Sequence, residues 1–115
     1  MAVTAFGTGA QLTIIGTEHF VANVNEAGVY TFHVDTNTMA AGDILELRVY
    51  QMITAAGTAR VAYLMIYYGA QPADDKIKIS VPISNELVDA QSLRFSLKQT
   101  FGAVQTLPWK VLKHA

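Results

Sequence analysis

Short runs in which apolar and polar residues alternate are the feature that most limits what this chain can fold into. The clearest are "VYTFHVD" at 29–35 and "SLRFSLKQT" at 92–100. A β-strand directs successive side chains to opposite faces, so these runs predict strands with one buried and one exposed face. No longer window shows a convincing helical period. The chain is therefore expected to be all-β.

Seven or eight strands are expected, separated by turns that contain Gly or Asn. Their predicted ranges are 12–15, 18–24, 29–35, 44–53, 59–68, 76–81, 92–100 and 107–115. The regular strands are each expected to direct one apolar set inward: Tyr30, Phe32 and Val34; Leu45, Leu47 and Val49; Leu93, Phe95 and Leu97; Leu107, Trp109 and Val111. Short strands at this spacing favour an antiparallel β-sandwich, jelly-roll-like, over any α/β arrangement.

The ends of the chain and its domain organisation follow from composition. Residues 1–11 are rich in Gly, Ala and Thr, and we expect them to form a flexible N-terminal arm. The remainder, 12–115, is expected to be a single β-sandwich domain, with at most one helical turn at 86–90. Half of the residues are hydrophobic (51%), which supplies enough apolar surface for a core without disulfides.

Charge and motif content argue against several classes of function. The net charge is −1 and the eight Lys and Arg residues are scattered, so direct nucleic-acid binding is not expected. No apolar run reaches membrane-spanning length and the N-terminus lacks the pattern of a signal peptide, so no membrane association is expected. The chain has no cysteine. Thiolate zinc sites are thereby excluded, and synthesis inside a cell is indicated.

Candidate catalytic residues are few. His33 and Asp35 share one face of a predicted strand, but a metal site needs further ligands from other strands. No serine elbow, phosphate-binding loop or calcium loop is present. We therefore expect no enzyme activity, no cofactor, no metal and no catalytic residue. A small hydrolase or lyase that uses His33 and Asp35 is kept as an alternative.

The strand that contains "AYLMIYYGA" (62–70) departs from simple alternation, because both of its faces are apolar. We expect Leu64 and Ile66 to face the core. The other face, together with the preceding strand, is rich in Tyr and Met and is expected to meet another chain: Tyr50, Met52, Tyr63, Met65 and Tyr67. Two alternative roles for this face stay open. The rings of Tyr50, Tyr63 and Tyr67 could stack on a sugar, or the face could be ordinary core under covering loops.

Five segments of the chain form a pattern when they are read in order: "GTEHFVANVNEAGVYTFHVDTNTMAAGDILELRVY" (16–50), "ARVAYLMIYYGAQ" (59–71), "KISVPIS" (78–84), "LRFSLKQTFG" (93–102) and "LPWKVLKH" (107–114). This pattern covers most of the chain, about residues 16 to 114, and it resembles small β-rich virion proteins of tailed bacteriophages. The resemblance implies a structural protein, made in the bacterial host cytoplasm and located in the virion.

Head decoration, or cement, is the role that this resemblance favours. It implies a homo-oligomer, with a trimer favoured, that contacts the major capsid protein or another virion protein. The alternative within the same class of particle is a carbohydrate-binding or host-recognition module of a tail or fibre.

Overall fold

The computed structural model describes residues 2–86 and 92–114, and it is an antiparallel β-sandwich. Within those ranges the chain forms nine strands and no helix, so none is long and apolar enough to cross a membrane. The strands are β1 (Val3–Leu12), β2 (Glu18–Val24), β3 (Gly28–Asp35), β4 (Ile44–Gln51), β5 (Arg60–Tyr68), β6 (Ile77–Ile79), β7 (Ile83–Asn85), β8 (Leu93–Phe101) and β9 (Thr106–His114). The all-β prediction is confirmed. The helical turn predicted at 86–90 falls almost wholly on 87–91, outside the described residues.

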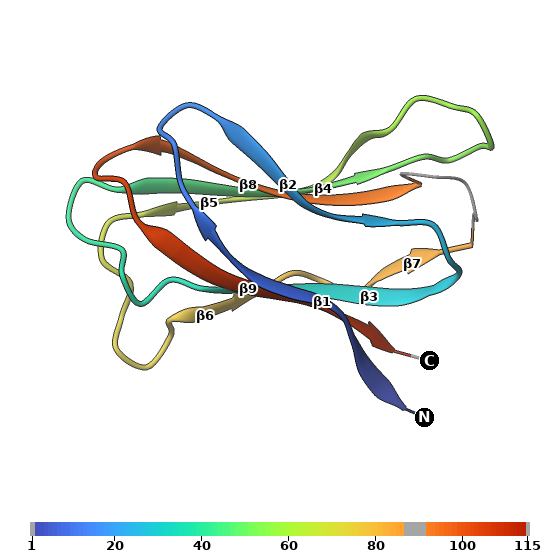
Figure 1. The fold of residues 1–115 in the computed structure, drawn as a ribbon, viewed down its shortest axis with the longest axis horizontal. Helices are drawn as coiled ribbons and strands as arrows, with labels where there is room; N and C mark the ends of the chain where they lie inside the picture. The colour runs from blue at the N-terminus through green and yellow to red at the C-terminus, as the bar shows by residue number, and fades with distance from the viewer. Residues whose placement is uncertain (1, 87–91, 115) are drawn as a thin grey trace.

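The two sheets lie one above the other (Figure 1). One sheet has the order β1-β9-β3-β6, and β7 pairs with the same edge of β3 as β6, nearer the start of that strand. The other has the order β2-β8-β4-β5. We refer to them as sheet A and sheet B. All pairings in both sheets are antiparallel, as predicted, and the jelly-roll connectivity stays a prediction.

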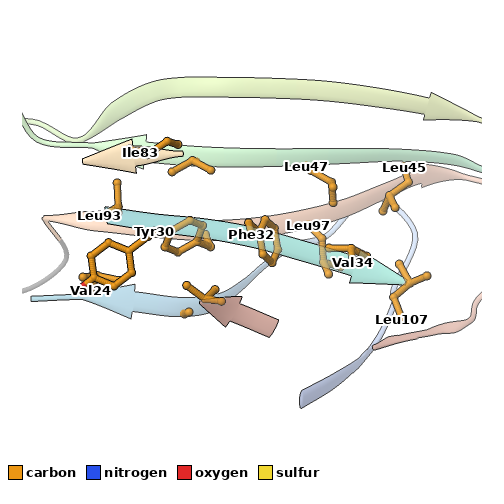
Figure 2. Close-up of a cluster of buried hydrophobic side chains, with 14 of the residues drawn as sticks. Val24, Tyr30, Phe32, Val34, Leu45, Leu47, Ile83, Leu93, Leu97 and Leu107 are labelled. Carbon is orange, nitrogen blue, oxygen red and sulfur yellow. The ribbon is translucent and has the colours of Figure 1, made fainter. Parts of the chain in front are cut away.

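The core fills the space between the sheets, and Figure 2 shows side chains from β3, β4 and β8 meeting there. The predicted inward sets of β3, β4 and β8 are fully buried, with at most 1% of each residue exposed. On β9, Leu107 and Val111 are also fully buried, and Trp109 packs partly buried against the same cluster. Each of these strands has one apolar face and one polar face. Burial of the apolar face decides which way the strand is oriented in its sheet.

Residues 3–12 form a strand, and the prediction of a flexible arm is wrong there. β1 pairs with β9 from Val3↔His114 to Leu12↔Thr106. Gly7 and Gly9 let β1 lie under the indole of Trp109, since a Cβ on Gly9 would lie 3.0 Å from that ring. The glycines that suggested a flexible N-terminus are therefore explained by the close approach of the Trp109 ring to the backbone of β1.

Four β-bulges shift the strand register, one each in β1, β2, β5 and β8, and alternation cannot reveal them. In β2 the register with β8 shifts between Phe20 and Ala22, so Phe20 lies opposite Ser96 and 39% of it is exposed. In β5 the register with β4 shifts by one residue at Ala62. An extra residue on one strand reverses the alternation on one side of the bulge.

Candidate interaction surface

β5 is the strand that the sequence singled out, and it lies at the edge of sheet B. Among the described residues it pairs with β4 alone, in a register that includes Val49↔Tyr63, Leu47↔Met65 and Leu45↔Tyr67. The hairpin turn that precedes it has Ala56 in the left-handed region at φ 57°. β5 is nine residues long, and the edge of the strand that faces away from β4 has no partner strand among the described residues.

The prediction of which way β5 faces is wrong. Directly opposite residues of an antiparallel pair project to the same side, and Leu45, Leu47 and Val49 all point into the core. Tyr63, Met65 and Tyr67 therefore lie on the core side. Leu64 and Ile66 lie on the outer face, where 45% and 38% of each residue is exposed.

Two of the core-side residues of β5 are half-buried and close the side of the sandwich. Tyr63 and Tyr67 pack against the hydrophobic core. Burial is the main cause that raises the pKa of Tyr67 to about 12. The ammonium of Lys78, itself buried, lies 5.0 Å from the centre of the Tyr67 ring and donates to the carbonyl of Asp75. The Tyr67 ring is thus already covered from within the chain, although Met65 stays 46% exposed.

The other two residues expected at an interface lie elsewhere. Met52 follows β4 and is only 9% exposed. Tyr50 is on the outer face of sheet B, where its ring packs at 5.5 Å from that of Phe20. Tyr50 is therefore separated by the sheet from Tyr63 and Tyr67. The three rings do not form the row that a sugar-stacking platform would need.

The outer face of sheet B is polar over β2, β8 and the middle of β4. The carboxylate of Glu18 accepts hydrogen bonds from the hydroxyls of Tyr50 (2.8 Å) and Ser96 (2.6 Å). Arg48 lies 3.8 Å from Glu18 and donates to Glu46 at 2.5 Å. Burial by itself would raise the pKa of Glu18. The bonds from Ser96 and Tyr50 and the charges of Arg48 and Lys98 outweigh it, so the pKa is below its usual 4.5.

Glu18→Gln is expected to flatten the acid side of the stability profile. A carboxylate whose pKa is lower in the folded state stabilises the fold above its unfolded pKa. That contribution is lost as the pH falls through the folded value. Urea unfolding between about pH 3 and 6 should show the wild-type free energy of unfolding falling more steeply than that of Glu18→Gln. Asp74→Asn, in an exposed loop, is the control. Parallel profiles of wild type and Glu18→Gln would contradict this assignment.

The remainder of the outer face, along β5, is apolar. The exposed large apolar side chains of β5 on this face are those of Val61, Leu64, Ile66 and Tyr68, and Phe101 of β8 is exposed on the same face. We call Leu64, Ile66, Tyr68 and Phe101 the β5 patch. Ile44 of β4 lies between Tyr68 and Phe101 in the sheet. It is paired with Tyr68 of β5 on one side and with Phe101 of β8 on the other. A shallow hollow of about 560 Å³ opens here, lined by Tyr68, Phe101 and the Gly42 turn. An exposed apolar group of this kind, next to a polar surface, is typical of an interaction site.

His33 and Asp35 lie on the outer face of sheet A, as expected, beside a shallow hollow of about 500 Å³ that Ile77, Ile79 and Lys110 also line. Each has a partner of its own. The His33 ring is bonded to the Thr31 hydroxyl (2.8 Å), and Asp35 accepts from the backbone of Asn37. Burial, Lys110 and His114 lower the pKa of His33. Within the described ranges no three metal-ligating side chains converge, so these residues are not assembled as a metal centre.

Comparisons of the chain with protein-family models, with curated proteins and with solved structures find no match. The β5 patch is therefore interpreted from its own chemistry. The sequence predicted that the strand at 59–68 is apolar on both faces, but it did not predict that Phe101 joins this surface, because Phe101 reaches it only by pairing with Ile44.

Proposed function

We propose that this protein is a structural component of a tailed-bacteriophage particle, most concretely a head decoration or cement protein. The observation that carries the proposal is the β5 patch, four large apolar side chains that are 38% to 67% exposed on the outer face of sheet B. The resemblance noted from the sequence supplies the class of particle. The patch supplies a surface with which such a protein would bind a neighbouring subunit.

The physical effect of such a protein is added buried area between subunits of a shell. Burial of apolar surface contributes roughly 25 cal/mol per Å² before the costs of association. A single contact between two subunits is therefore weak once the costs of association are subtracted. Repetition over many copies on one particle makes the total resistance to rupture large.

The direct test uses purified particles of a phage whose genome encodes this chain. Mass spectrometry is expected to detect the chain, and particles that lack it are expected to lose DNA at a lower temperature. Purified protein added back should restore the release temperature. Absence of the chain from the particles, or add-back without effect, would overturn the proposal.

A matched pair of variants connects that result to the β5 patch. Phe101→Ser removes the 62%-exposed ring of the patch, and Val104→Ser alters a similarly exposed residue (56%) three positions along, outside it. Phe101→Ser is expected to weaken binding to depleted particles by about tenfold, which corresponds to about 1.4 kcal/mol. Val104→Ser should bind as wild type does. Equal binding by both variants would exclude the patch as the contact.

A further inference from the structure

The free edge of β5 has backbone groups whose direction can be assigned. The N–H of Gly69, just after β5, donates to the carbonyl of Asp43, just before β4, at 2.7 Å. In an antiparallel pair, bonded positions alternate with positions whose N–H and C=O point away from the partner strand. Counting back from Gly69 in the unbroken register, residues 63, 65 and 67 bond to β4. The backbone groups of Leu64, Ile66 and Tyr68 therefore point to the free edge.

For two of these three residues, no side chain in the described ranges forms a hydrogen bond with the backbone groups at the free edge. The Tyr68 carbonyl accepts a hydrogen bond from the Gln71 side chain at 3.2 Å. No side chain in the described ranges bonds to the backbone of Leu64 or Ile66. Proteins usually guard such an edge with charges, prolines or a covering loop. β5 has no proline, and its one charged residue, Arg60, is at its start.

We propose that this edge pairs with β5 of a second copy of the chain, antiparallel, with the two-fold axis at Met65. The inference rests on the proposed function in that it names a partner for the strand that carries most of the β5 patch. Leu64 of each copy would lie opposite Ile66 of the other, so both uncovered residues gain hydrogen bonds, four in total. The result is one continuous sheet built from sheet B of two copies.

The side chains of two paired β5 strands are compatible with each other on both faces of the sheet. In this register Leu64 packs beside Ile66 on the outer face, and Tyr63 lies opposite Tyr67 on the inner face. Each pair is apolar or aromatic, the kind of cross-strand pair that stabilises sheets. The two Arg60 side chains lie at opposite ends of the paired strands, so no like charges meet. A strand of different sequence could use the same edge, but β5 itself meets every one of these requirements.

Engineered cysteines test this register, since the chain has no native cysteine. Met65 would lie opposite its own copy in a non-hydrogen-bonded pair, with Cα atoms about 4.5 Å apart. That distance falls within the range of about 4.4–6.8 Å that a disulfide spans. Met65→Cys, oxidised at low protein concentration, is expected to form the linked dimer about tenfold faster than Ile79→Cys. Ile79 is 54% exposed on β6 of the other sheet, so it measures random collision.

Sedimentation equilibrium measures the same contact without a crosslink. The wild-type chain of 12.5 kDa is expected to reach twice that mass as its concentration rises. Ile66→Lys places a charge at the centre of the edge and should shift the chain to the monomer. Ile79→Lys should leave the dimer intact. Thermal melting of both variants confirms that they are folded at the temperature of the experiment.

The outcomes separate the two proposals. A monomer at every concentration, or equal crosslinking rates at positions 65 and 79, overturns the edge pairing. A trimer that Ile66→Lys does not disturb also overturns it, while the particle assay still decides the cement role. A dimer that crosslinks through position 65 but is absent from particles supports the edge pairing and removes the proposed function.

Discussion

Phe95→Ala is expected to lower the free energy of unfolding by about 3–5 kcal/mol. Phe95 is fully buried on β8, a central strand of sheet B, and its ring lies 5.4 Å from that of Phe32 on sheet A. Its removal deletes a ring contact between the two sheets and leaves a cavity that close-packed neighbours cannot fill. Urea unfolding followed by tryptophan fluorescence measures the change.

Phe101→Ala is the matched control for Phe95→Ala, because Phe101 belongs to the same strand and 62% of it is exposed. Its free energy of unfolding should stay within about 0.5 kcal/mol of wild type. A loss below about 1 kcal/mol for Phe95→Ala would show that the two sheets do not pack through this ring.

Asp43→Ala is expected to lower the free energy of unfolding by about 3 kcal/mol. Only 4% of Asp43 is exposed. Its carboxylate accepts hydrogen bonds from the backbone N–H of Ala40 (2.9 Å) and Ala103 (3.1 Å) and from the side-chain amide of Gln105 (2.9 Å). One side chain thus connects the turn before β4 to the turn after β8. Alanine would leave all three donors without this acceptor.

Asp43→Asn separates the loss of hydrogen bonds from the loss of volume. The amide keeps one acceptor oxygen and replaces the other with a donor, so an intermediate loss is expected. Asp74→Ala, in an exposed loop, should have almost no effect on the same urea titration. If Asp43→Ala unfolded at the same urea concentration as Asp74→Ala, the hydrogen-bonded junction would not contribute to stability.

The hydrogen-bonded junction around Asp43 also explains why residue 102 is a glycine. Gly102 has φ +104°, and a Cβ there would lie 2.8 Å from the Cα of Asp43. Both the backbone angle and the space therefore require glycine. The turn that exposes Phe101 at the end of the β5 patch is held in place by Asp43 and Gly102 together.

Several features of the fold could be predicted from the sequence because each is a local property of the chain. Strands with one apolar face and one polar face, such as 29–35 and 92–100, have a single orientation that buries the apolar set. For this reason their inward residues are confirmed and their bounds agree with β3 and β8 to within one residue. Lack of a helical period in the same way predicted an all-β chain.

The tertiary structure alone decided the orientation of β5 and the shape of the surface around it. Both faces of β5 are apolar, so its own pattern does not say which face is buried; pairing with Leu45, Leu47 and Val49 decides that. Lys78 gives a related example. It alternates with Ile77 and Ile79, yet the lysine is buried and both isoleucines are exposed, because Asp75 and the Tyr67 ring provide partners for the ammonium. Alternation specifies that two faces differ, and only the neighbouring strands determine which of them is inside.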